Sequence, residues 1–321
     1  TNRERSGTLE NGVVVCVSAV LVVLYGSMSS SPAHRRLVAS TSMLNDGALH
    51  LVRPKSLRCC DATIYHRNAS SALLLGELMR LDYFRPQFSD WEWPKQLFSI
   101  EFDVKAETVA LLLVDMQFTY TDSNGSFAKA LARLNPEMAR LFKERVEKRV
   151  LPGNLRLLRA FREARRQIVY TKHLRFIPDG RDLILRRRTR DKIAVAETGF
   201  SHMGHSGSRD AEIVETLKPE VGDYVVEKNS SSPFNSTGID QVLRNMNIET
   251  LVVTGLATDM CVITTARDAA DRGYNVIVAE DACTTFDLAS HESALVNFSR
   301  VYGKVMQSEG VLELLNLTSS I

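Results

Sequence analysis

The sequence has few cysteines and almost no net charge. Its 321 residues include five cysteines, an odd number in which Cys59 and Cys60 are adjacent. Such a sparse set predicts no disulfide framework, and a reducing compartment is the simpler interpretation. The formal net charge of +2 is too small to indicate nucleic acid or an acidic membrane surface as a partner.

Long hydrophobic runs are lacking as well. The apolar run from Val13 to Tyr25 has about 13 residues, whereas a membrane-spanning helix needs roughly 20, so we expect no stable membrane span. Arg3 and Arg5 before this run and small residues after it outline a secretory signal, although Glu4 and Glu10 do not fit its basic leader.

Two other interpretations of this start stay open. Residues from Met28 onward are rich in serine and arginine and have no acid before Asp46, which resembles an organelle transit peptide. The segment upstream of Met28 or Met43 also fits untranslated or mispredicted sequence, because the chain begins with Thr1. We expect a cytoplasmic protein and keep organelle targeting and secretion as alternatives.

Residues 1–105 show no regular alternation of strands and helices. We interpret them as an irregular N-terminal extension, with one helix over residues 72–81, and residues 106–321 as the main domain. An aromatic cluster without interleaved basic residues predicts an apolar flap packed on the main domain rather than a platform for nucleobases. The cluster consists of Tyr83, Phe84, Phe88, Trp91 and Trp93.

Strand and helix patterns alternate from Thr108 to the end, in a chain of ordinary globular composition with 44% hydrophobic residues. The apolar strands predict a parallel sheet covered by helices on both faces. We expect strands at 109–114, 168–171, 223–228, 251–254, 274–279 and 303–306, and helices at 136–149, 154–166, 210–217, 237–246, 261–272, 290–300 and 309–315. The connection 172–208 shows no obvious element, and its basic run RRRTRDK at 186–192 is interpreted as a solvated face.

Cys261 follows the strand that Gly255 ends and begins the next predicted helix. The carboxyl edge of a parallel sheet is where α/β folds bind ligands, and a helix N-terminus favours a thiolate, so we expect a lowered thiol pKa. A free cysteine is more often a small buried apolar residue, so this position alone does not make Cys261 a nucleophile.

Two further strand ends carry groups that could activate such a thiol. Asp115 follows the first strand of the main domain, and Lys228 ends the third. Each residue taken alone fits a turn aspartate or an exposed lysine, but the three together favour a catalytic site. Lys172 also ends a strand and is a rival to Lys228, although no Ser-Pro-Phe segment follows it.

Three ordered motifs carry a resemblance to a known family. They are LLLVDMQ at 111–117, VVEKNSSSPFNST at 225–237 and TGLATDMCVITTARDAADRGYNVIVAEDAC at 254–283. Over residues 108–315 the chain resembles the isochorismatase-like cysteine hydrolase superfamily. The resemblance implies a three-layer α/β/α sandwich around a mainly parallel sheet of about six strands. It also implies Asp115, Lys228 and Cys261 as the catalytic set, whereas residues 1–105 have no counterpart.

The resemblance also indicates the class of reaction. The run from SSSPF through TARDAADRGY is most similar to ureido and carbamoyl amidohydrolases, so we expect C–N cleavage of a small amide or ureido compound. The family implies a cis bond between Leu256 and Ala257, with backbone N–H groups of Ala257 and Cys261 as oxyanion donors. Vinyl-ether hydrolysis of the isochorismatase type and a non-catalytic interaction module are the alternatives.

No metal and no other cofactor is expected. Nicotinamidases in this superfamily pair a T-x-D-x-H strand end with further histidines, whereas residues 171–175 read TKHLR without an aspartate. His202 and His205 form only a pair without a helical frame, so we interpret them as loop residues. Nicotinamide is therefore a weaker substrate candidate.

A small-molecule substrate and a homo-oligomeric protein are the expected partners, with no nucleic acid. Residues on or near the strand ends are candidates to shape the substrate pocket. They are Gln117, Phe118, Tyr120, His173, Arg175, Phe200 and Phe234.

Overall fold

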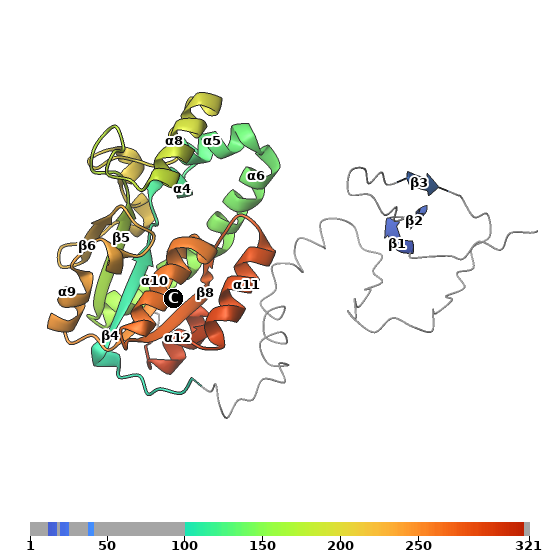
Figure 1. The fold of residues 1–321 in the computed structure, drawn as a ribbon. Coiled ribbons are helices and arrows are strands. Elements are labelled where there is room, and N and C mark those ends of the chain that lie inside the picture. The colour runs from blue at the N-terminus through green and yellow to red at the C-terminus, as the bar shows by residue number, and fades with distance from the viewer. Residues whose placement is uncertain (1–11, 18–19, 26–37, 42–99, 318–321) are drawn as a thin grey trace, which may run out of the picture. The chain divides into compact units, whose positions relative to one another are not determined.

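The computed structural model describes residues 12–17, 20–25, 38–41 and 100–317 (Figure 1). The chain divides into two compact units, residues 1–68 and 69–321. In the first unit, β1 (Gly12–Val17), β2 (Val20–Tyr25) and β3 (Val38–Thr41) form an antiparallel sheet. The expected helix at 72–81 and the aromatic cluster lie outside the described residues, and the boundary at 105/106 stays a prediction.

The second unit contains the expected parallel sheet. Its six strands are β4 (Val109–Val114), β5 (Gln167–His173), β6 (Tyr224–Lys228), β7 (Thr250–Leu256), β8 (Asn275–Thr284) and β9 (Lys304–Met306). They lie in the order β6-β5-β4-β7-β8-β9, and every neighbouring pair is parallel. The chain thus builds one half of the sheet outward from β4, then returns to build the other half from β7.

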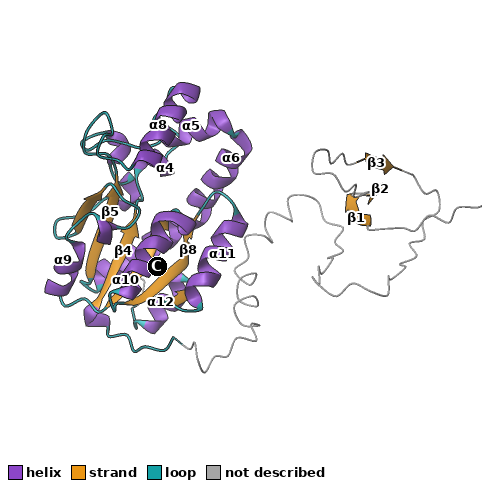
Figure 2. Ribbon diagram, viewed as in Figure 1, coloured by secondary structure: helices purple, strands orange, loops and turns teal. Residues whose placement is uncertain are grey.

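Helices cover both faces of this sheet (Figure 2). Alternate residues of β4 divide between two cores, because successive strand side chains point to opposite faces. Ala110, Leu112 and Val114 pack with α9 (Ile239–Asn245), α10 (Ile263–Asp271) and α11 (Leu288–Ser299). Val109, Leu111 and Leu113 pack with α6 (Pro136–Arg145), α7 (Leu151–Glu163) and α12 (Ser308–Leu314). The three-layer α/β/α sandwich is therefore confirmed.

The predicted break between two helices at Pro152 and Gly153 is wrong. A π-helical turn, η3 (Val146–Val150), joins α6 to α7, and Pro152 lies in the first turn of α7. Gly153 lets α7 approach β8 closely, because a Cβ there would lie 2.9 Å from the carbonyl oxygen of Asp281.

The connection at 172–208 contains a helix that the sequence pattern did not predict. Helix α8 (Leu185–Thr198) includes the whole basic run and ends at Gly199, whose φ is 76°. It buries only Asp191 and Thr198, so it lacks the apolar periodicity by which a helix is recognised. Two short helices before it in the chain, α4 (Phe118–Thr121) and α5 (Ser126–Leu134), were also not predicted.

The helix predicted at 210–217 is wrong. Only two short 3-10 turns form there, η4 (Arg209–Ala211) and η5 (Glu215–Leu217). The segment between them bonds to residues after β4 instead of to itself: Phe118 donates its N–H to Glu212 at 2.7 Å, and Val214 donates to Met116 at 2.9 Å.

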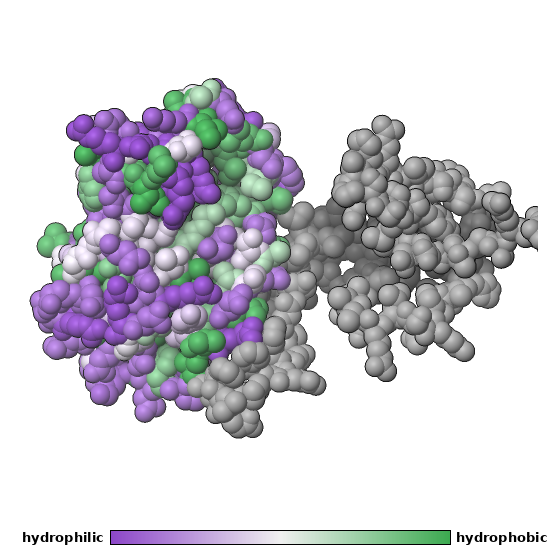
Figure 3. All heavy atoms as spheres, in the orientation of Figure 1, coloured by the Kyte–Doolittle hydropathy of each residue, from purple (hydrophilic) through white to green (hydrophobic). Residues whose placement is uncertain are grey.

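Polar residues cover most of the face shown in Figure 3, with hydrophobic residues among them. The exposed hydrophobic side chains of α5 and α8 are Leu134, Leu185, Ile193 and Val195. Among the described residues, no helix is both long enough and apolar enough to span a membrane.

Gly255 fixes the close contact between β4 and β7. Its φ is 109°, and a Cβ there would lie 2.0 Å from the carbonyl oxygen of Val114. We expect Gly255→Ala to lower the free energy of unfolding by at least about 2 kcal/mol, since backbone strain adds to a clash with fixed backbone atoms. Urea unfolding followed by circular dichroism measures this loss.

Gly238 is the matched control, because its φ is negative and a Cβ there would meet no atom within 4 Å. Gly238→Ala should change the free energy of unfolding by no more than about 1 kcal/mol. Equal losses in the two variants would contradict the close contact at Gly255.

Candidate active site

Four strand ends bring polar side chains together at the carboxyl edge of the sheet. Asp115 follows β4 directly, His173 and Lys228 are the last residues of β5 and β6, and Cys261 lies after β7 in the π-helical turn η7 (Thr258–Val262). The strand order reverses between β4 and β7, which is the place where open α/β sheets bind ligands.

A buried ion pair joins Asp115 to Lys228. Lys228 Nζ donates to Asp115 Oδ2 at 2.7 Å and to the carbonyl oxygen of Ser230 at 3.2 Å. Thr171 Oγ1 donates to Asp115 Oδ1 at 2.6 Å. Lys228 is fully buried and Asp115 is 2% exposed, so each charge depends on these bonds in place of water.

The thiol of Cys261 lies beside this ion pair. The Sγ atom of Cys261, a carboxylate oxygen of Asp115 and a ring nitrogen of His173 all lie within 4.8 Å of one another. Burial raises the pKa of Cys261 to about 11, although the positive charge of Lys228 opposes the increase. The expected lowering by the helix N-terminus is therefore wrong for the resting protein, because the cost of desolvating a thiolate is larger.

His173 lies next to both the thiol and the carboxylate. Its Nδ1 is 3.6 Å from Cys261 Sγ and 3.9 Å from Asp115 Oδ2. Burial, and then the charge of Lys228, lower the pKa of His173 well below its usual value, so the imidazole is neutral near pH 7. Its Nε2 is buried and has no hydrogen-bond partner among the described residues.

Residues 109–310 match the family model of the isochorismatase domain, and they make up well over half of the chain. The chain belongs to the isochorismatase family. A solved cysteine hydrolase from Pseudomonas syringae pv. phaseolicola 1448A shares the fold with a TM-score of 0.55 and 24% identity. The superposition covers 68% of this chain and 96% of that one.

Two curated relatives are similar over shorter stretches. Nicotinamidase 3 from Arabidopsis thaliana is 36% identical over 95 residues, which cover 29% of this chain and 48% of that protein. A ureidoacrylate amidohydrolase from Methylobacterium radiotolerans is 42% identical over 100 residues, which cover 31% of this chain and 39% of that protein. The chain thus spans less than half the length of either relative.

The turn before Cys261 has a cis peptide bond between Leu256 and Ala257. The carbonyl oxygen of Ala257 accepts from Met260 N at 3.0 Å and from Val262 N at 3.2 Å, which closes the turn around the cysteine. In this part of the isochorismatase fold, local backbone hydrogen bonds therefore hold the turn that carries the thiol, and the thiol does not lie on a mobile loop.

Lys172 faces away from this site. Its ammonium pairs with Glu212 at 3.3 Å and with Glu227 at 3.0 Å. The structure thus places Lys228, and not its rival, against Asp115.

Of the seven residues expected to shape the pocket, His173 contacts the thiol, and Tyr120 is near enough for the charges of the site to act on it. Burial, followed by the charges of Asp115 and Cys261, raises the pKa of Tyr120. Gln117 is instead used inside the fold: its amide donates to the carbonyls of His173 and Ala211 and accepts from His173 N at 2.7 Å. It fixes the end of β5 and leaves no donor for a ligand.

The other four have different neighbours. The ring of Phe118 stacks on Arg209, with the guanidinium carbon 4.2 Å from its centroid. Phe200 packs under the cations of α5, Lys129 and Arg133. Phe234 is buried in the core, where its ring lies 6.0 Å from that of Tyr274. These aromatic rings therefore pack against residues of neighbouring elements.

Arg175, the fourth, is tied to helix α8 through Asp191, a residue that the sequence analysis did not identify. Asp191 accepts from Arg175 Nη1 at 2.8 Å and from Ser201 Oγ at 2.6 Å, and lies 2.9 Å from His202 Nδ1. Burial opposes ionisation, but the bonds from His202 and Ser201 lower the pKa of Asp191 to about 2. The one acid within a basic run was the signal in the sequence.

The donor set of Asp115, His173 and Cys261 would suit a zinc ion by ligand type. Asp115 Oδ2, however, already holds the ammonium of Lys228 at 2.7 Å, and that charge opposes a second cation. His202 and His205 bond to Asp191 and to the carbonyl of Ser206 respectively. The residues present therefore fit an ion pair better than a metal.

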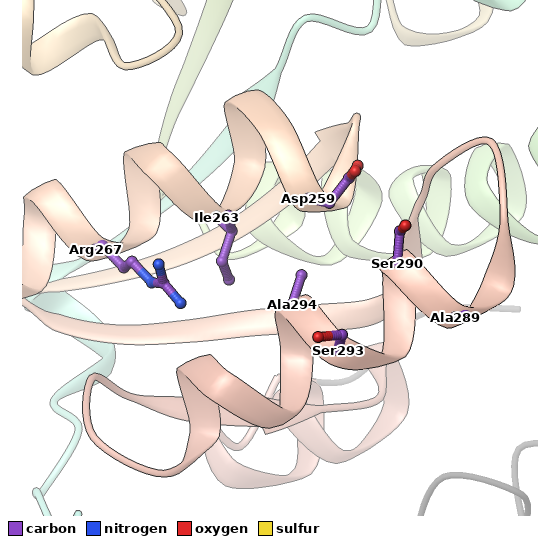
Figure 4. A pocket seen from close by; sticks show the side chains of 7 residues that line it. All are labelled: Asp259, Ile263, Arg267, Ala289, Ser290, Ser293 and Ala294. Carbon is purple, nitrogen blue, oxygen red and sulfur yellow. The ribbon is translucent and has the colours of Figure 1, made fainter. Parts of the chain in front are cut away.

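A hollow between η7, α10 and α11 is separate from the strand ends (Figure 4). Its volume is about 460 Å³, and Asp259 and Arg267 lie toward opposite ends of it. None of Asp115, His173, Lys228 and Cys261 lines it, so it is not the space around the thiol.

The ion pair predicts a strongly non-additive mutant cycle. Lys228→Met leaves a buried carboxylate without a counter-charge, and Asp115→Asn leaves a buried ammonium, so each should lower the free energy of unfolding by about 3–5 kcal/mol. The double variant should lose clearly less than the sum, because no charge is then left unpaired. Urea unfolding measures all four proteins.

Lys172→Met is the matched control, since the glutamates that it frees can be hydrated. It should cost at most about 1 kcal/mol. Simple additivity of the two single losses would show that the pair does not stabilise the fold in this way.

Proposed function

We propose that this protein is a cysteine-dependent hydrolase that cleaves a C–N bond of a small amide or ureido compound. The observation that carries the proposal is the buried carboxylate–ammonium pair beside the thiol of Cys261. A thiol with a pKa of about 11 is protonated near pH 7, so attack on a substrate needs a base within reach. Asp115 is that base.

Acylation begins when Asp115 takes the thiol proton as the sulfur of Cys261 attacks the carbonyl carbon. The C–S bond forms, and the backbone N–H groups of Ala257 and Cys261 hold the oxyanion. Asp115 then gives its proton to the nitrogen, the C–N bond breaks, and ammonia or an amine leaves. The product on the protein is a thioester.

Hydrolysis of the thioester reverses these roles. Asp115 accepts a proton from water, the hydroxide adds to the carbonyl carbon, and the C–S bond breaks to release an acid. The sulfur recovers the proton from Asp115. Lys228 stabilises the carboxylate whenever it is ionised and fixes its position, since its own hydrogen bonds leave it little freedom.

His173 is a substrate contact in this scheme. Its Nε2 is buried and has no hydrogen-bond partner among residues 100–317, so it is available to a polar group of the substrate. Because its imidazole is neutral, His173 can position a polar group of the substrate without competing with Lys228 for the carboxylate.

The names of the two curated relatives denote hydrolysis of a nicotinamide and of a ureidoacrylate, which supports an amide or ureido substrate. Vinyl-ether hydrolysis is the alternative for an isochorismatase-family chain, and a non-catalytic interaction module is another. The cysteine and its base favour C–N cleavage, because neither alternative needs both.

A panel of small primary amides, including nicotinamide, and of ureido acids tests the proposal through ammonia release. We expect turnover of at least one compound, its loss in Cys261→Ala, and a decrease in kcat of about 10²–10⁴-fold in Asp115→Asn. Cys283→Ala, which removes another buried free thiol, is the control and should keep the activity.

Vinyl-ether cleavage that persists in Cys261→Ala would favour the isochorismatase-type reaction. Absence of any turnover by the wild-type protein, together with a Cys261 that no alkylating reagent modifies, would favour the interaction module.

The cytoplasmic location and the homo-oligomeric state stay predictions. Mass spectrometry of the native N-terminus tests the first, because removal of a leader would indicate secretion or organelle import. Light scattering of the purified protein tests the second.

A further inference from the structure

Arg187 on helix α8 contacts the turn that follows β6. It is half-buried, as is Arg188, whereas its neighbour Arg186 is exposed. Its Nη2 donates to Ser231 Oγ at 2.8 Å, and the adjacent Ser230 carbonyl accepts from Lys228 Nζ at 3.2 Å. The turn after β6 therefore contacts both the guanidinium of Arg187 and the ammonium of the buried ion pair.

Arg187 has no carboxylate within ion-pair distance among residues 100–317 of the described chain. Asp191, one helical turn later, is the usual partner by spacing, but Arg175, Ser201 and His202 already use its oxygens. The nearest carboxylate before Arg187 in the sequence also accepts hydrogen bonds from other groups.

That carboxylate belongs to Asp182. Its two oxygens accept from the backbone N–H groups of Phe176 at 2.8 Å and Ile177 at 3.2 Å. The Nε of Arg187 is buried and has no hydrogen-bond partner in the described part of the chain. A half-buried guanidinium with an unused donor and no counterion is costly in the free protein, and an anionic ligand would remove that cost.

The charge of Arg187 reaches the groups at the strand ends. Burial raises the pKa of Cys261, and Lys228 and Arg187 both oppose that increase. Burial lowers the pKa of His173, and the same two cations lower it further. Lys228 is neutralised by Asp115, and the thiol and the imidazole are neutral near pH 7, so Arg187 leaves the space around the thiol positively charged.

We propose that Arg187 is a specificity-determining residue that binds the carboxylate of the substrate. The inference rests on the proposed cysteine hydrolase and narrows its substrate class to amides or ureido compounds that carry a carboxylate. A guanidinium suits a planar carboxylate because its N–H donors match the carboxylate oxygens. Neutral amides such as nicotinamide would leave Arg187 without a partner.

The test uses two alkylating reagents of nearly equal size, iodoacetate and iodoacetamide, which differ in the carboxylate. The rate of modification of Cys261 by each is measured by peptide mass spectrometry in the full chain. The ratio of the two rates cancels changes in the thiol itself and needs no knowledge of the natural substrate.

Arg187→Gln should lower the iodoacetate-to-iodoacetamide ratio about tenfold or more, which is the effect of losing one hydrogen bond to a charged group. Arg187→Lys should give an intermediate ratio, because it keeps the charge but not the planar donors. Arg186→Gln removes the same charge from an exposed position of α8 and should leave the ratio unchanged.

A change of less than about twofold in Arg187→Gln, or an equal decrease in Arg186→Gln, would overturn the role of Arg187 while the nucleophile stands. If iodoacetamide fails to modify Cys261 in the wild-type protein, the nucleophile itself is contradicted, and the inference that rests on it fails too. The two failures are therefore distinguishable.

Discussion

The ion pair between Asp115 and Lys228 is the constraint on which the candidate site depends. Strand β5 lies between β4 and β6, so the pair reaches across a strand, and Thr171 of that strand completes the coordination of the carboxylate. Two charges without water tolerate little displacement, because each would otherwise be left unpaired in a buried environment. The pair thereby holds three strand ends in register at the edge where the thiol lies.

The same burial decides how the thiol can be used. A helix N-terminus and a nearby ammonium both favour a thiolate, yet desolvation is stronger, and the pKa of Cys261 rises to about 11. A protonated resting thiol attacks an electrophile only when a neighbouring base takes its proton, since the thiolate is the reactive form. In the proposed reaction its activation depends on the neighbouring carboxylate, which couples reactivity to the presence of a substrate in position.

In the role proposed for Arg187, helix α8 adds charge selection to the candidate site. It is held by polar contacts, of which Asp191 supplies several, rather than by an apolar face. Such contacts are directional, so they fix the orientation of α8 and place Arg187 against Ser231 in the turn after β6. Variation of one surface helix could therefore change substrate charge without altering Asp115, Lys228 or Cys261.

The sequence by itself determined the layered fold, the order of the strands along the chain and the residue types at the strand ends. Buried parallel strands are continuous apolar runs, and the motifs around Asp115, Lys228 and Cys261 are local. The strands and the motifs can therefore be recognised in the sequence alone. Only the tertiary structure decided that Lys228 rather than Lys172 meets Asp115, that Phe234 belongs to the core, and that Arg187 turns inward. Those outcomes depend on contacts between residues far apart in the chain and on desolvation, which no local pattern records.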